Sequence, residues 1–117
     1  MKKMHLFLSA LALLLLVVSC SKSGSGSNDP AITCDGTPKT FVTDVNPLIQ
    51  SFCNQPGCHT NGSSNGPGPL TNYTQVFNAR SAIRSAVSSG FMPRNATLST
   101  AQKMAIICWI DNGAPNN

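Results

Sequence analysis

The segment from Phe41 to Asn117 contains few large apolar side chains for its length. Only 20 of its 77 residues are Val, Leu, Ile, Phe, Met, Trp or Tyr. Domains of this size rarely stabilise themselves on so small a core unless a disulfide, a metal or another prosthetic group is added. We therefore expect an additional group to complete the fold, and a large apolar cofactor would provide the missing core.

The first 19 residues have the pattern of a secretory signal peptide. Two lysines precede an apolar run from Leu6 to Val18, which is shorter than the roughly 20 residues needed to span a membrane. The run ends in Val-Val-Ser-Cys, which resembles the bacterial lipobox. This resemblance predicts that Cys20 is acylated and becomes the first residue of the mature chain. Ordinary cleavage near Ser19, with Cys20 left as a free thiol, is the alternative.

A Ser- and Gly-rich stretch follows Cys20 and is typical of a flexible tether. We predict that residues 20–40 form the acylated cysteine and its tether, and that residues 41–117 form the folded domain. Such a chain is anchored to a membrane by lipid on its periplasmic side, in an oxidising compartment. Ser21 stands where an Asp retains familiar lipoproteins at the inner membrane, which favours the outer membrane.

The charge pattern excludes two classes of function. Residues 20–117 carry six Lys or Arg and four Asp, with no basic run and no Glu. A nucleic-acid-binding protein needs a concentrated basic face, so we expect no nucleic-acid partner. Catalysis by paired carboxylates is equally disfavoured, because most of the Asp residues fall at predicted turns and helix ends.

The pattern of apolar and turn residues predicts an all-α fold with long irregular loops. Val45 to Phe52 forms the first expected helix, with Asp44 as its N-cap and Pro47 in its first turn. The stretch 54–69 is rich in Gly, Pro, Asn and Ser and predicts a loop. A second helix starts at Asn72 and stops at Gly90, with a possible interruption near Asn78, and a third covers 100–111 between a Ser99/Gln102 capping box and Gly113.

Two cysteines and a histidine stand together at the end of the first predicted helix. Cys53 and Cys58 are followed directly by His59, a pattern typical of covalent haem attachment. The chemistry needs two thiols for the two vinyl groups of the porphyrin and an adjacent imidazole for the iron. The usual spacing has two residues between the cysteines, and this chain has four. In a regular helix that separation would rotate the second thiol about 140° away from the first, so the Pro56-Gly57 turn must absorb the difference.

The order of motifs resembles the small bacterial members of the cytochrome c family. Gly90-Phe91-Met92-Pro93 resembles the Met-Pro segment that delivers their distal ligand, and residues 98–114, which contain Trp109, resemble their closing helix. The resemblance covers about residues 45–115. It implies a fold of about three short helices around one haem c, with covalent thioethers at Cys53 and Cys58 and His59 as the proximal iron ligand. It also favours packing of Trp109 on the porphyrin edge, whereas a core anchor would look the same in sequence.

Elimination supports the same distal ligand independently of that resemblance. His59 is the only histidine beyond the predicted signal peptide, so two histidines cannot bind one iron within one mature molecule. Of the two remaining thioethers, Met104 lies inside the last predicted helix and is better explained as core filler. Met92 lies beside Pro93 in an irregular segment and is the better candidate. A Met92 that merely packs, leaving the iron open, is the alternative.

Cys34 and Cys108 remain as a pair. In an oxidising compartment they are expected to form a disulfide that joins the N-terminal arm to the last helix, and two free thiols are the alternative. Arg80, Arg84 and Arg94 are candidates for haem propionates, although exposed arginines are commoner.

The leading hypothesis is therefore a membrane-tethered electron carrier, not an enzyme, that exchanges electrons with an unidentified redox protein. An open sixth position on the iron would instead allow ligand sensing or peroxide chemistry. One alternative is a thiol or zinc module built on Cys53, Cys58 and His59. Another is a structural surface lipoprotein stapled by two disulfides and without haem.

Overall fold

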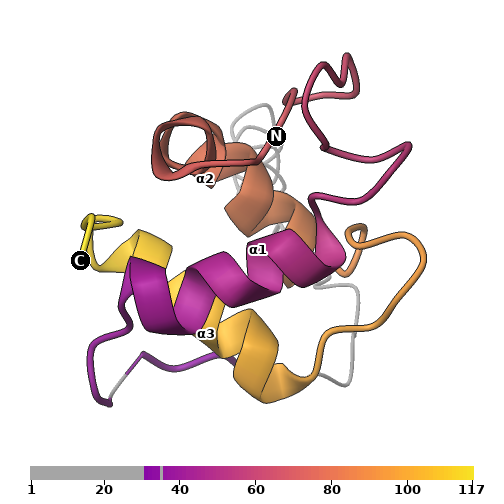
Figure 1. Ribbon diagram of the computed structural model, residues 1–117. Coiled ribbons are helices and arrows are strands. Elements are labelled where there is room, and N and C mark those ends of the chain that lie inside the picture. Colours follow the sequence, from indigo (N-terminus) through magenta and orange to yellow (C-terminus); the bar gives the residue numbers. More distant parts are fainter. Residues whose placement is uncertain (1–30, 35) are drawn as a thin grey trace, which may run out of the picture.

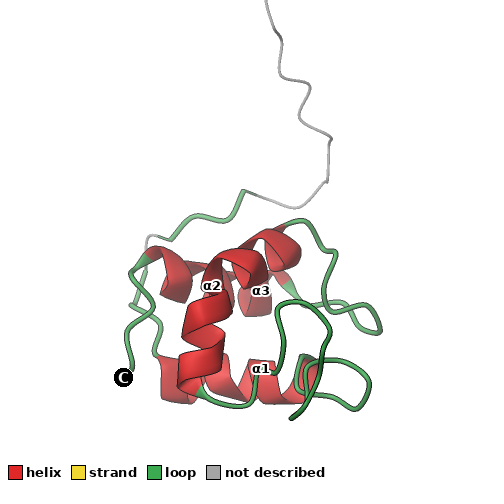
Figure 2. Cartoon of the chain, turned by 90° about the horizontal axis from the view of Figure 1, so that it is seen from above, coloured by secondary structure: helices red, strands yellow, loops and turns green. Residues whose placement is uncertain are grey.

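The computed structural model describes residues 31–34 and 36–117, and within them it is purely helical. The elements are a short π-helical turn, η1 (Phe41–Val45), that runs directly into α1 (Asn46–Phe52), followed by α2 (Tyr73–Ser88) and α3 (Thr100–Asp111). No β-strand occurs among the described residues, in agreement with the all-α prediction (Figure 2). The long segments 53–72 and 89–99 connect the helices as loops.

The first helical segment begins earlier than predicted, and Asp44 is not its N-cap. Thr40 holds that position, since its hydroxyl accepts the Thr43 N–H. The Asp44 carboxylate accepts the Thr40 N–H at 2.7 Å, and this bond holds the pKa of Asp44 below its usual value. Thr40 and Asp44 thus resemble a capping box, but the acidic residue lies four residues after the N-cap, whereas in a capping box it lies three residues after it. The π turn, in which Asn46 N–H reaches the Phe41 carbonyl, accommodates that extra residue.

The caps predicted for the other two helices are confirmed. The Asn72 side chain accepts the Gln75 N–H at the start of α2, and Ser99 and Gln102 form a complete capping box at the start of α3. Helix α2 runs without interruption through Asn78. It ends before Gly90, whose φ of +73° is a conformation that glycine adopts without strain.

The hydrophobic core is built around one tryptophan. Trp109 is fully buried and lies 5.4 Å from the Phe41 ring and 6.4 Å from the Tyr73 ring, measured between centroids. Its indole N–H donates to the Pro115 carbonyl at 2.9 Å, so the one polar atom of the ring is satisfied. Tyr73 likewise donates to the Ala114 carbonyl. The end of the chain is also bound to η1, because the Phe41 N–H donates to the Asn117 side-chain oxygen and the Val42 N–H to the Asn117 carbonyl; Figure 1 shows that end of the chain beside the start of the first helical segment.

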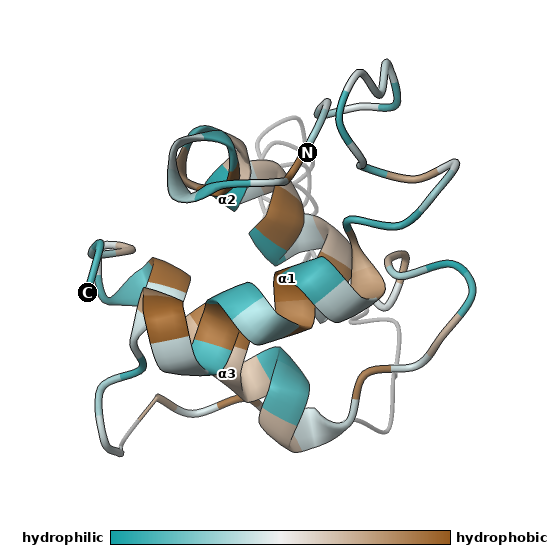
Figure 3. Cartoon of the chain, viewed as in Figure 1, coloured by the Kyte–Doolittle hydropathy of each residue, from teal (hydrophilic) through white to brown (hydrophobic). Residues whose placement is uncertain are grey.

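Hydropathy follows this arrangement. In Figure 3, hydrophobic residues concentrate on α3 and on parts of α1 and α2, whereas the loop after α1 is mostly hydrophilic. The core cluster therefore joins η1, α1, α2 and α3, and it includes Leu70 and Leu98 from the two loops.

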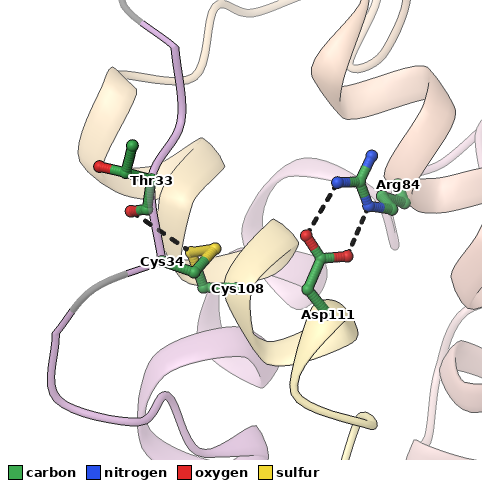
Figure 4. The surroundings of a disulfide bond; sticks show 5 residues. All are labelled: Thr33, Cys34, Arg84, Cys108 and Asp111. Carbon is green, nitrogen blue, oxygen red and sulfur yellow. Dashed lines mark hydrogen bonds and ion pairs between the residues drawn. A yellow bond between two sulfur atoms is a disulfide. The ribbon is translucent and has the colours of Figure 1, made fainter.

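A disulfide connects the N-terminal arm to α3, as the sequence analysis expects. Cys34 and Cys108 are joined by an S–S bond of 2.08 Å (Figure 4). Ile32, two residues before Cys34, packs against the core cluster. The folded unit thus includes arm residues on the N-terminal side of Phe41. Figure 4 also shows Arg84 of α2 paired with Asp111 of α3 through two hydrogen bonds of 2.6 and 2.8 Å, which lowers the pKa of Asp111.

The predicted signal peptide, the acylated Cys20 and most of the tether lie outside the described residues. Within residues 31–34 and 36–117, no helix is long and apolar enough to cross a membrane.

The disulfide closes a long loop, so its removal should be costly. We expect the double variant Cys34→Ser/Cys108→Ser to have a free energy of unfolding lower by about 3 kcal/mol, because the unfolded chain gains entropy when the cross-link is lost. Urea denaturation followed by circular dichroism measures this difference. A loss below about 1 kcal/mol would contradict it, given the 2–4 kcal/mol that is typical.

Candidate functional site

A cavity of about 900 Å³ lies between the end of α1, the C-terminal half of α2 and the two long loops. Figures 1 and 2 both show these loops on the same side of the helices. All residues that line the cavity belong to the segment 51–96, so neither η1 nor α3 contributes to its walls. Its volume lies at the upper end of the range of small-molecule and cofactor sites, roughly 300–1,000 Å³.

One wall of the cavity is apolar and comes from α2. Two alanines, Ala82 and Ala86, alternate there with Ile83 and Val87, one helical turn apart. Ile83 and Val87 also belong to the core cluster, so this stretch of α2 separates the core from the cavity. The short alanine side chains leave the space open. A second hollow of about 650 Å³ beside the same helix is lined by six residues, none of them Cys, His or charged.

The loop that follows α1 contributes to the cavity the histidine predicted as proximal ligand. His59 is only 6% exposed, and it is the one polar or charged residue in the buried set among the described residues. Its Nδ1 lies 2.9 Å from the Gly68 carbonyl oxygen. Because a carbonyl can only accept, Nδ1 is the donor, and in the neutral imidazole Nε2 is the nitrogen with the free lone pair. Hydrogen bonds from His59 N–H to Cys53 and from Leu70 N–H to His59 fix the backbone on both sides.

Cys53 and Cys58 lie in the same wall as His59, and both are free, half-buried thiols. Helix α1 ends at Phe52, and the chain then turns: Gln55 N–H donates to Cys53, Cys58 N–H donates to Gln55, and Gly57 adopts a φ of +77°. The turn takes up the two additional residues of the motif. Burial raises the pKa of the Cys53 thiol to about 11, and the neighbouring Cys58 acts in the same direction.

The loop between α2 and α3 brings Met92 to the cavity. Its backbone N–H donates to the Ala86 carbonyl at 3.1 Å, which ties this residue to the end of α2. Met104, the other thioether beyond the predicted signal peptide, is half-buried on α3 and is not among the residues that line the cavity. The structure therefore places the four predicted haem-binding side chains, Cys53, Cys58, His59 and Met92, around one space.

Of the predicted haem contacts other than the ligands and thioethers, only Arg94 lines the cavity. Arg94 is the one charged residue in the cavity lining, and its guanidinium lies 4.8 Å from the centre of the exposed Phe91 ring. Arg84 is engaged by Asp111, and Arg80 donates to the Phe77 carbonyl. Trp109 does not line the cavity, because it is fully buried in the core beside the Phe41 ring.

Sequence reasoning missed two residues that shape the site. Gly68 supplies the carbonyl that orients His59, and Asn65 donates to the backbone carbonyls of the cysteine turn. Backbone carbonyls carry no residue-type signal. Asn65 is one of several asparagines in a polar loop, so its role follows only from the folded geometry.

No protein-family model, curated protein or solved structure matches this chain. Among residues 31–34 and 36–117, no group of three or more His, Cys, Asp or Glu side chains is placed to hold a metal ion. The role of Cys53, Cys58, His59 and Met92 therefore has to be inferred from their placement around the cavity.

The raised pKa of Cys53 predicts slow alkylation. In the reduced chain at pH 8, Cys53 should react with iodoacetamide about a hundredfold more slowly than a thiol with a pKa of 9.0, because the thiolate is the nucleophile. The rate should rise with pH up to about 11. Peptide mass spectrometry measures it, with the urea-unfolded chain as control. Equal rates in the folded and unfolded chains would contradict the prediction.

Proposed function

We propose that this protein is a small c-type cytochrome that carries one covalently attached haem and transfers electrons outside the cytoplasm. The observation that supports this most strongly is the placement of Cys53, Cys58 and His59 in one wall of a largely apolar cavity, with Met92 brought in by a separate loop. Two thiols, one imidazole and one thioether are the donor set that such a group requires. When bound, haem supplies one-electron chemistry at its iron.

The chain's own residues favour this group in three ways. The Nδ1–H bond of His59 to Gly68 fixes the tautomer and the orientation of the imidazole. Cys53 and Cys58 are unbridged, so each retains the S–H that thioether formation consumes. The wall of Ala82, Ile83, Ala86 and Val87 would exclude water from one face of a flat apolar ligand.

An exposed arginine in the cavity lining, Arg94, suits the propionate edge of a haem. Arg94 is the charged residue of the lining and has no ion pair recorded with an acidic side chain of the described chain. We assign to Arg94 the role of pairing with a haem propionate, in preference to Arg84, whose charge is already used by Asp111. With the lipid anchor and export expected for residues 1–40, the carrier would be tethered to a bacterial membrane on its periplasmic side and would serve a redox protein there.

Covalent attachment is the direct test. The mature chain, exported in cells that contain haem-attachment machinery, should show a c-type spectrum in alkaline pyridine after reduction, and its colour should survive extraction with acidified acetone. Cys53→Ser and Cys58→Ser should each leave one thioether, and the double variant should leave none. A colourless wild-type chain with more than one attachment system would overturn the proposal and favour a thiol or zinc module, which thiol counting and zinc analysis would then separate.

Ligation by Met92 has a matched control in the chain itself. Met92→Ala should lower the reduction potential of the haem-loaded protein by on the order of 0.1 V, because a thioether ligand raises the potential and axial ligands together span about 0.8 V. Met104→Ala, which truncates the same side chain away from the cavity, should leave the potential unchanged. Spectroelectrochemical titration of both variants measures the shifts, and equal potentials would exclude Met92 as a ligand.

A further inference from the structure

The cysteine turn contains two consecutive backbone carbonyls that need hydrogen-bond donors. The chain leaves the helix at Cys53 to accommodate four residues before Cys58, so the carbonyls of Gly57 and Cys58 have no helical N–H to accept from. Both carbonyls instead accept from the same side-chain nitrogen. Asn65 Nδ2 lies 2.9 Å from the Gly57 oxygen and 3.0 Å from the Cys58 oxygen.

A single amide group therefore bridges the peptide units on either side of the second cysteine. Carbonyl oxygens only accept, so the amide nitrogen of Asn65, and not its oxygen, faces them. The Ser63 hydroxyl donates to the same Cys58 carbonyl, and the Asn65 N–H donates in turn to that hydroxyl at 3.2 Å. The two side chains form a small bracket over the turn, and Asn65 also lines the cavity.

The bracket acts on position more than on stability. Asn65 is exposed, so water can replace its hydrogen bonds when it is removed, and the net cost of such a loss is small. The orientation of the Cys58 side chain, in contrast to the stability of the fold, depends strongly on Asn65. That orientation is set by the two peptide units that Asn65 bridges, and these units lie outside any helix.

We propose that Asn65 is a positioning residue that holds the Cys58 thiol beside Cys53 and His59, and so makes the four-residue spacing usable. The inference rests on the proposed function for its effect on haem attachment. Its effect on the geometry of the two thiols is independent of haem and can be measured without it.

The test uses Asn65→Asp, which preserves the shape of the side chain but replaces the donor by an acceptor. Asn61→Asp is the matched control, because Asn61 is exposed in the same loop and the charge change is the same. Asn65→Ala, which removes the donor without adding charge, separates the lost hydrogen bonds from the new charge. Thermal melting of each variant shows that it is folded.

Two readouts are made on the full mature chain. Without haem, the equilibrium between the Cys53–Cys58 dithiol and its disulfide is measured against glutathione by peptide mass spectrometry. With attachment machinery present, covalent haem per polypeptide is measured from the pyridine spectrum. We expect both the disulfide-forming constant and the haem content to fall about three- to tenfold in Asn65→Asp and Asn65→Ala, the factor that one or two lost polar contacts produce. Asn61→Asp should match the wild type.

The outcomes separate the two proposals. If the wild type carries haem and the Asn65 variants match Asn61→Asp in both readouts, the positioning role is overturned and the proposed function stands. If all chains are colourless while the Asn65 variants still weaken the dithiol equilibrium, the positioning role stands and the haem proposal fails.

Discussion

The shortage of large apolar side chains divides the molecule into two halves. Most of the large side chains pack around Trp109, between η1, α3 and the first half of α2, where the aromatic contacts lie. The second half of α2 has only Ile83 and Val87 as large apolar side chains, and it faces the cavity with these two and with Ala82 and Ala86. Since protein interiors pack densely, an opening of this size beside a small core supports the proposal that a ligand binds there.

The loop side of the cavity has no regular secondary structure, yet its key side chains are held firmly. The imidazole of His59 is fixed by the Gly68 carbonyl, and the backbone around it by bonds to Cys53 and Leu70. The Asn65 side chain donates to the carbonyls of Gly57 and Cys58, the two residues that precede His59. Irregular backbone can be as well ordered as a helix when its polar groups find partners within the chain. A hydrophilic segment around a ligand site is built in this way.

The sequence alone predicted the helices well where capping side chains mark their ends. Asn72, Ser99 and Gln102 located the starts of α2 and α3, since a cap is a local interaction between residues close in the chain. The predicted start of the first helix was wrong, because Thr40 and not Asp44 is the N-cap. Asp44 lies one residue beyond the position that a standard capping box uses, and its carboxylate accepts the Thr40 N–H. The position of Trp109 could not be predicted either. A core anchor and a cofactor contact have the same residue type, and only the packing of η1 against α3 distinguishes them.

The placement of the disulfide follows from the same division. Cys34 and Cys108 join the arm to α3, which takes no part in the cavity walls, so the cross-link stabilises the half that already holds the core. A ligand that binds only the folded state stabilises it by mass action, but a chain that must fold before it is loaded cannot depend on that contribution. With the fold secured by Trp109 and the disulfide, the chain's own contacts place Cys53, Cys58 and His59 around one cavity. Under the proposed function, the geometry that attachment requires would belong to the protein itself.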